Sequence, residues 1–90
     1  MVFHYNIHIY GRVQGVGFRY AARTVALQYE LTGFVRNMVN GSVYIEIEGS
    51  AQDCMAFIDW CRIGPGYGRV DDVEVNESNI SGFEEFVIKR

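Results

Sequence analysis

The feature that most constrains the fold of this chain is a change of hydrophobic period that occurs twice along it. Between residues 3 and 10, apolar and polar side chains alternate, which predicts a strand with one buried face. Residues 11–17 contain three glycines and interrupt this pattern, as a loop does. From Phe18 to Glu30 the apolar residues recur at the spacing of an amphipathic helix. The N-terminal part of the chain is therefore expected to fold as strand, loop and helix.

Strand-like periods return in the middle of the chain. Residues 31–39 and 42–49 both alternate, and Asn40-Gly41 between them predicts a tight hairpin, because both residue types tolerate positive φ. The inward side chains of the second of these strands are Val43, Ile45 and Ile47.

A second helix follows this hairpin. Ser50 with Asp53 resembles a capping box, which marks a helix start. The apolar stripe behind it ends in the glycine-rich run at 64–68, which we interpret as a loop. Two short strands complete the chain, at 71–77 and 83–89.

The order of the elements is βαββαβ with an added C-terminal strand, which predicts an α+β, ferredoxin-like split βαβ sandwich. We expect two helices on one face of a mixed, largely antiparallel sheet, and a single domain over residues 1–90. In this topology the first and second strands are parallel, with the third between them. The loop after the first strand and the end of the second strand therefore meet, so Gly15 to Arg19 and Asn37 are expected to surround one pocket.

Composition and charge exclude several classes of protein. The chain is 49% hydrophobic and 21% charged, so it can bury a core and is not disordered. Its net charge of −3 is the opposite of that expected for a non-specific nucleic-acid binder. No apolar run approaches the roughly 18 residues that span a bilayer, and the N-terminus does not resemble an export signal. We therefore expect a soluble cytoplasmic protein that binds neither nucleic acid nor membrane.

The two cysteines, Cys54 and Cys61, both fall in the second predicted helix. Seven residues of helix place their backbones roughly 10 Å apart, whereas a disulfide needs Cα atoms within about 7 Å. Neither a CxxC nor a CxxH spacing is present, which argues against a zinc site. We interpret both cysteines as core residues and expect no metal and no cofactor.

The glycine-rich loop that opens the first helix carries the chemical signal. Gly15 and Gly17 allow successive backbone N–H groups to converge on an anion. The helix N-terminus adds unpaired N–H donors and a partial positive charge. Arg19 lies in the first turn, where a cation opposes the helix dipole. A bound dianion would remove this conflict, and the planar fork of Arg19 matches phosphate oxygens.

Two familiar phosphate-binding loops do not match this segment. The dinucleotide fingerprint requires a glycine at the position of Tyr20, and no Gly-Lys-Ser/Thr of a P-loop follows. The alternative without a function is an ordinary strand-to-helix turn with a solvent-exposed arginine.

Two segments resemble the motifs of a known family. GRVQGVGFR at residues 11–19 resembles the signature of the acylphosphatases, and GFVRNMVNGSV at 33–43 is similar to their second motif. The resemblance continues through GRVDDVEV at 68–75 and runs nearly end to end. It implies the fold predicted above, and hydrolysis of acyl phosphates to a carboxylate and inorganic phosphate. From the chemistry of such a substrate, whose carboxylate leaves without a general acid, we hypothesise a metal-free reaction in which a positioned water attacks phosphorus in line.

The family's functional residues can be carried over to matching positions. The phosphate-binding arginine falls on Arg19, and the asparagine that positions the water falls on Asn37. The anion cradle falls on the backbone N–H groups of Gln14, Gly15, Val16, Gly17 and Phe18.

Other residues that could carry chemistry receive simpler interpretations. Asn40 is assigned to turn formation and Arg23 to a solvated helix face, from which it could reach the pocket rim. His4 and His8 share a strand face roughly 13 Å apart, too far to bind one metal, so we expect surface or partner-contacting residues. Two aromatic residues are interpreted as packing or partly exposed side chains: Trp60 and Tyr20.

Three alternatives remain beside a stand-alone, monomeric hydrolase of small-molecule acyl phosphates. The same cradle could bind phosphate without catalysis. The fold also occurs in RNA-binding modules, although the open sheet face carries carboxylates such as Glu46 and Glu74 that repel a phosphate backbone. Similar domains also occur fused to larger proteins that handle carbamoyl phosphate.

Overall fold

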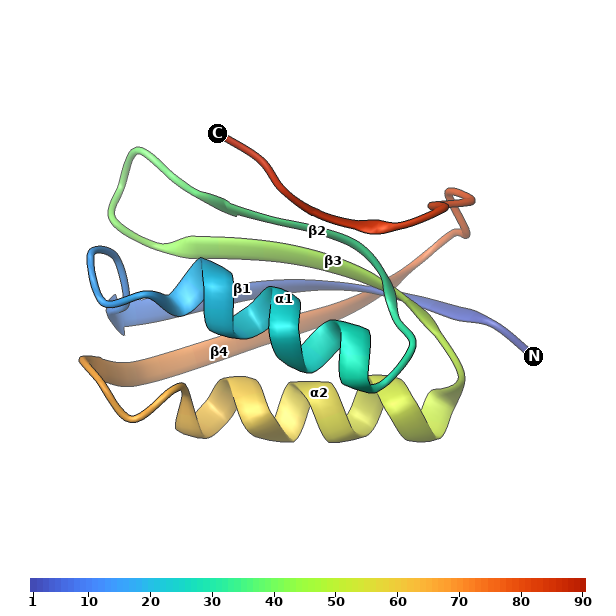
Figure 1. Cartoon of the computed structure of the whole chain (residues 1–90), viewed down its shortest axis with the longest axis horizontal. Helices are drawn as coiled ribbons and strands as arrows, with labels where there is room; N and C mark the ends of the chain where they lie inside the picture. Colours follow the sequence, from blue (N-terminus) through green and yellow to red (C-terminus); the bar gives the residue numbers. More distant parts are fainter.

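A computed structural model describes residues 1–90 as a five-stranded sheet with two helices packed on one face (Figure 1). The strands and helices form where the hydrophobic period predicts them. In chain order they are β1 (Phe3–Arg12), α1 (Phe18–Gln28), β2 (Thr32–Asn37), β3 (Val43–Gly49), α2 (Ala51–Ile63), β4 (Arg69–Ser78) and β5 (Phe86–Ile88).

The strand order is β4-β1-β3-β2-β5. β1 pairs antiparallel with β3 and β4, β3 pairs antiparallel with β2, and β5 pairs parallel with β2. β3 therefore lies between the parallel strands β1 and β2, which confirms the ferredoxin-like fold predicted from the element order. The loop after β1, the start of α1 and the β2–β3 hairpin meet at one end of the molecule, on the left in Figure 1.

The core lies between the helices and the sheet face they cover. Most inward residues of β1 and β3 are fully buried, as their alternation predicts, whereas Phe3 and Tyr5 near the start of β1 are half-buried. α2 contributes one row of buried side chains at helical spacing. Ser50 caps the start of α2 by accepting a hydrogen bond from the Asp53 N–H, as expected. The buried residues of α2 are Cys54, Phe57, Ile58 and Cys61.

Several details differ from the sequence-based expectation. β1 continues to Arg12, into the segment predicted to be a loop, β2 is shorter than predicted, and β4 is longer at both ends. α1 ends at Gln28 rather than at residue 30, and Glu30 has a left-handed backbone with φ 55°. The last strand covers only Phe86–Ile88. In the β2–β3 hairpin only Gly41 has a positive φ, whereas the Asn40 side chain accepts hydrogen bonds from the backbone N–H and the hydroxyl of Ser42. Asn40 thus keeps its predicted turn role, but through its side chain.

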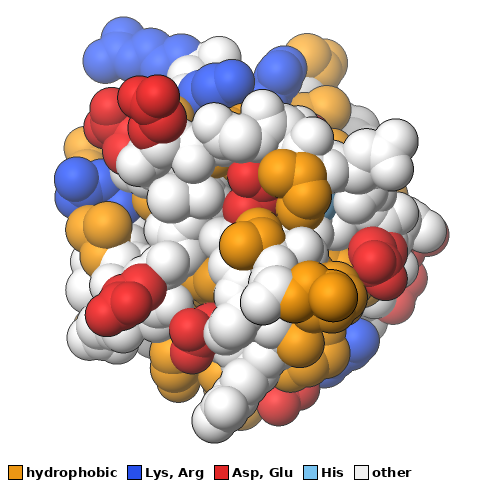
Figure 2. All heavy atoms as spheres, turned by 90° about the vertical axis from the view of Figure 1, so that its right-hand side faces the viewer, with side chains coloured by type: hydrophobic (Ala, Val, Ile, Leu, Met, Phe, Trp, Pro, Cys, Tyr) orange, Lys and Arg blue, Asp and Glu red, His pale blue; other side chains and the backbone are white.

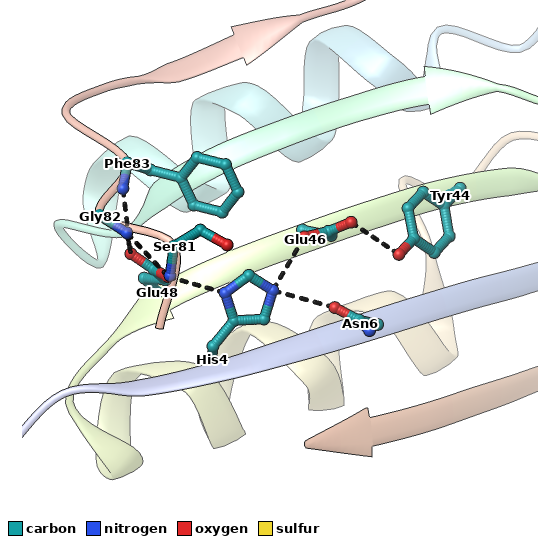
Figure 3. Close-up of polar contacts among 8 residues, drawn as sticks. All are labelled: His4, Asn6, Tyr44, Glu46, Glu48, Ser81, Gly82 and Phe83. Atoms are coloured by element: carbon teal, nitrogen blue, oxygen red, sulfur yellow. Dashed lines mark hydrogen bonds and ion pairs between the residues drawn. The ribbon is translucent and has the colours of Figure 1, made fainter. Parts of the chain in front are cut away.

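The prediction that His4 lies on the surface is wrong. Its side chain is only 2% exposed and lies between carboxylates of β3 (Figure 3). His4 Nδ1 is 2.7 Å from Glu48, and Nε2 is 2.8 Å from Glu46 and 2.9 Å from the Asn6 side-chain oxygen. Acceptors face both ring nitrogens, and this arrangement favours the doubly protonated imidazolium over the neutral ring.

Glu48 connects this histidine to the segment between β4 and β5. Although the period places Glu48 on the outward face of β3, it is 4% exposed. Its carboxylate accepts hydrogen bonds from the backbone N–H groups of Ser81, Gly82 and Phe83. The Phe83 ring covers His4 at 5.5 Å between centroids (Figure 3). The segment between β4 and β5 therefore crosses the open face of the sheet and buries polar groups. The alternation alone predicts these groups to be exposed.

The pKa values of the pair shift in opposite directions. Burial lowers the pKa of His4, but its bonds to Glu48, Asn6 and Glu46 outweigh this and raise it above its usual value. Burial raises the pKa of Glu48, but His4 and three backbone N–H groups outweigh this and lower it. The His4 contribution to stability is thus present at low pH and lost as pH rises through its raised pKa. The Glu48 contribution is present at neutral pH and lost as pH falls through its lowered pKa.

We expect the Glu48→Gln variant to lose about 3 kcal/mol of unfolding free energy at pH 6, because it breaks a buried charged pair. The loss should shrink between pH 6 and pH 9, because a rise in pH through the raised pKa of His4 removes the charge with which Glu48 pairs. Urea unfolding followed by Trp60 fluorescence at both pH values measures this. The control is Glu74→Gln on the exposed part of the same sheet face, where we expect less than about 0.5 kcal/mol. A loss of equal size at both pH values would contradict the charged pair.

The end of the molecule opposite the β2–β3 hairpin shows no continuous apolar face. Figure 2 views this end, where hydrophobic and acidic side chains are scattered and basic side chains gather along the upper edge. Neither helix is long and apolar enough to cross a membrane.

Candidate active site

A cavity of about 140 Å³ opens where β1 ends and α1 begins. It lies at the end of the molecule where the loop after β1 approaches the β2–β3 hairpin (Figure 1). Residues distant in sequence meet there, since Asn37 comes from β2 and the others from the loop and α1. The lining residues are Val13, Gly15, Gly17, Phe18, Arg19, Tyr20 and Asn37.

The loop backbone presents a row of free donors. Gly15 has φ 74° and Gly17 has φ 78°, both in the left-handed region that favours glycine. None of the backbone N–H groups of residues 14–18 donates a hydrogen bond within the chain. Gly17 is the N-cap of α1 and provides no side-chain cap. Unpaired N–H groups at a helix start, following glycines with left-handed backbones, form an anion-binding nest.

Arg19 lines the cavity from the first turn of α1 and is half-buried. No carboxylate lies within ion-pair distance of its guanidinium, and no acidic residue stands in the first turn of the helix. The cation therefore adds to the positive end of the helix dipole with no internal counter-charge. The structure places an unpaired positive charge beside the free N–H groups.

Asn37 reaches the same cavity from the end of β2. It is half-buried and shares its side of the strand with the fully buried Val35, in register with Val43 of β3. Its side-chain amide makes no hydrogen bond within the chain, so both its oxygen and its NH₂ group are free for a ligand or a water. Asn37 lies on the inward side of β2, and this places its amide at the same cavity as Arg19.

The side chain of Gln14 has a role that the sequence analysis missed. The resemblance implies only a backbone N–H role for Gln14, and Gln14 does not line the cavity. Its side-chain NH₂ donates to the carbonyl oxygens of Met38, at 2.8 Å, and Ser42, at 2.9 Å. Gln14 thus ties the loop to the hairpin that follows Asn37. No local pattern reveals such a contact, because its partners are backbone atoms of a distant segment.

We expect Gln14→Glu, whose carboxylate cannot donate these hydrogen bonds, to lower kcat/KM about tenfold without a change of fold. The loop and the hairpin would separate, and small displacements of positioned groups are costly to catalysis. The unfolding free energy should fall by about 1–2 kcal/mol. Urea unfolding and steady-state kinetics with an acyl phosphate, the substrate class that the sequence resemblance implies, measure both effects. An unchanged kcat/KM would show that Gln14 does not position the loop.

Packing explains why the other loop residues are held in place. Val16 does not line the cavity; its side chain lies against Gly68 in the loop before β4, where an added Cβ would collide with the Arg12 carbonyl oxygen. Phe18 is 2% exposed and packs on Trp60 at 5.4 Å between ring centroids. The start of α1 is therefore held in place by its packing on the core. Trp60 has the packing role predicted for it.

Several other predicted features stand apart from the cavity. Arg23 is exposed and does not line the cavity, in keeping with a solvated helix face. His8 is half-buried against Tyr44, with ring centroids 4.6 Å apart. Both cysteines are free and buried, and burial raises the pKa of Cys54 to about 11 and that of Cys61 further. Neither thiol is a nucleophile at neutral pH.

Comparisons with protein families, sequences and solved structures all point to the same family. The family model described as Acylphosphatase matches residues 5–88. An acylphosphatase of Geotalea uraniireducens is 43% identical over 83 residues, covering 91% of each chain. The crystal structure of the Bacillus subtilis acylphosphatase superposes with a TM-score of 0.95 at 36% identity, covering 100% of both chains. Full-length HypF, solved in a phosphate- and nucleotide-bound form, matches over only 12% of its chain, with a TM-score of 0.90 and 32% identity.

Proposed function

Because the chain belongs to the acylphosphatase family, we propose that the cavity at the start of α1 is the site at which it hydrolyses acyl phosphates. The products are a carboxylate and inorganic phosphate. The roles assigned below to individual residues are part of this proposal.

The observation that carries the proposal is an unpaired guanidinium beside a row of unpaired backbone N–H groups. Arg19 and residues 14–18 present positive charge and donors with no acceptor in the chain. A phosphoryl group supplies the acceptors that such a site lacks, because its oxygens take hydrogen bonds from several directions and carry the compensating charge. The planar fork of Arg19 can hold two of these oxygens at once.

The chemistry of the substrate explains why so few groups suffice. The acyl leaving group departs as a carboxylate, whose conjugate acid has a pKa of about 4, so no general acid is needed. Phosphoryl transfer through a loose transition state depends mainly on positioning and on stabilising charge on the equatorial oxygens. Arg19 and the loop N–H groups provide that stabilisation.

Asn37 completes the site by orienting the attacking water. Its amide oxygen accepts a hydrogen bond from the water, and its NH₂ group can donate to the water or to a phosphoryl oxygen. The water oxygen bonds to phosphorus while the bond from phosphorus to the acyl oxygen breaks. The carboxylate leaves with the electron pair, and the proton of the water passes to the phosphate product or to solvent. No covalent intermediate and no metal takes part in this scheme.

Hydrolysis of acetyl phosphate by the purified protein, with and without EDTA, tests the proposal. We expect turnover above the spontaneous rate in both cases. Absence of turnover would favour a non-catalytic phosphate-binding domain, and loss of turnover with EDTA would contradict the metal-free scheme.

The active unit is proposed to be a monomer that acts on small-molecule acyl phosphates. The groups to which the proposal assigns a role gather at one cavity of a single protomer, namely Arg19, Asn37 and the N–H groups of the loop. Size-exclusion chromatography with static light scattering, at the concentration of the activity assay, tests this point.

A further inference from the structure

Tyr20 is a large aromatic residue that does not pack in the core. It is 74% exposed, although it lines the cavity. It lies in α1 away from the buried stripe of that helix, which is formed by Phe18, Ala22 and Ala26. Its hydroxyl makes no hydrogen bond within the chain, and the one side chain that bonds to Tyr20 is Thr24, whose hydroxyl donates to the Tyr20 carbonyl oxygen. Neither core packing nor internal hydrogen bonding explains an aromatic ring here.

The rest of the lining divides the cavity by chemistry. The unpaired N–H groups, Arg19 and Asn37 form its polar part. Val13 and Phe18 are apolar but 1% and 2% exposed, so they form the floor and offer little surface to a ligand. Tyr20 is the one large apolar side chain that both lines the cavity and is exposed. An apolar group extending out of the cavity can therefore make its main apolar contact with the Tyr20 ring.

The substrate has such a group. If the phosphoryl end occupies the polar part, the acyl end cannot occupy the same donors and must extend toward the mouth of the cavity. No acidic side chain and no cation besides Arg19 lines the cavity, so nothing there is suited to a charged acyl group. A flat apolar acyl group can lie against the exposed ring.

We propose that Tyr20 is a specificity-determining residue that packs against the acyl group and favours acyl phosphates with aromatic acyl groups. This proposal rests on the proposed function of the same cavity. The helix holds the backbone of Tyr20 next to Arg19, so the ring stands beside the phosphoryl site without a further conformational change. The contact is present in both the bound substrate and the transition state, so it acts mainly on KM.

The test compares benzoyl phosphate with acetyl phosphate in Tyr20→Ala, Tyr20→Phe and the wild type. We expect Tyr20→Ala to lower kcat/KM for benzoyl phosphate by about 3- to 10-fold, the size of one aromatic contact, mainly through a higher KM. The value for acetyl phosphate should change by less than about 2-fold. Tyr20→Phe should keep the wild-type preference, because the hydroxyl is unused. Comparing each variant with the wild type on the same substrate removes the intrinsic difference between the two leaving groups.

Tyr67 provides a matched control. It is 75% exposed, like Tyr20, but does not line the cavity, so Tyr67→Ala should leave the preference unchanged. The inference is overturned if Tyr20→Ala changes kcat/KM for both substrates equally, or for neither, or if Tyr67→Ala reproduces its effect. Failure of the proposed function would appear differently, as an Arg19→Ala variant that hydrolyses both substrates at the wild-type rate.

Discussion

Replacing Arg19 by alanine is expected to lower kcat/KM for acetyl phosphate by about 10³-fold or more. The change removes the only side-chain cation lining the cavity, and with it both phosphate binding and stabilisation of charge in the transition state. We expect Arg19→Lys to recover only part of this loss, because an ammonium keeps the charge but not the two-pronged geometry. Steady-state kinetics with all three proteins measure these differences.

The same variant makes a second measurement informative. Arg19 opposes the dipole of α1 and has no ion-pair partner, so its removal should leave the unfolding free energy unchanged or raise it by about 0.3–1 kcal/mol. An arginine kept for stability would show the opposite sign. Arg23→Ala, on the exposed face of the same helix, is the control and should retain wild-type kinetics. Wild-type kinetics in Arg19→Ala would show that the cavity is not the active site.

Replacing Asn37 by alanine is expected to lower kcat about 10²-fold or more, the usual effect of removing one preorganised polar group from a transition state. KM should change much less, because Arg19 and the loop N–H groups still bind the phosphoryl group. Asn37→Asp should not recover the activity, since a carboxylate beside a phosphoryl group adds repulsion between like charges. Kinetics over a range of acetyl phosphate concentrations separate kcat from KM.

Two asparagines serve as controls for this prediction. Asn76→Ala on exposed β4 should leave both kinetics and stability unchanged. Asn40→Ala should cost stability, because Asn40 accepts two hydrogen bonds from Ser42 in the hairpin turn, while its effect on kcat should be far smaller than that of Asn37→Ala. If Asn37→Ala raised KM and left kcat unchanged, Asn37 would be a binding residue and not the group that orients the water.

The fold was predictable because its signals are local and agree with one another. Each of these signals describes one short segment: the alternation in β1 and β3, the helical spacing in α2, and the Ser50 cap. Together they leave few possible topologies. Prediction was weaker where a local signal is faint. The three residues of β5 are paired with only one neighbouring strand, and the end of α1 depends on a left-handed residue, Glu30, that is not a glycine.

The candidate site was predictable in part, for a related reason. Gly15, Gly17 and Arg19 lie within one loop and one helical turn, so the conflict between a cation and a helix N-terminus can be recognised in the sequence. Asn37 could be added because strand parity and topology place it at the same edge. The Gln14 side chain could not be assigned, because its acceptors are the carbonyl oxygens of Met38 and Ser42, and a backbone carbonyl has no signature in a sequence.

The sequence by itself determined which side chains face the core, where the chain turns, and that a cation stands at the start of a helix. These properties follow from hydrophobic period and backbone preference, which act over a few residues. Only the tertiary structure decided the surroundings of polar groups. His4 and Glu48 are 44 residues apart, yet they are joined and buried because the segment from Ser81 to Phe83 crosses over them. Tyr20 is exposed at the rim of a cavity rather than on a featureless surface because β2 ends beside α1. Burial of a polar group, or exposure of an apolar one, depends on which distant segment covers it, and the covering segment is known only when the chain has folded.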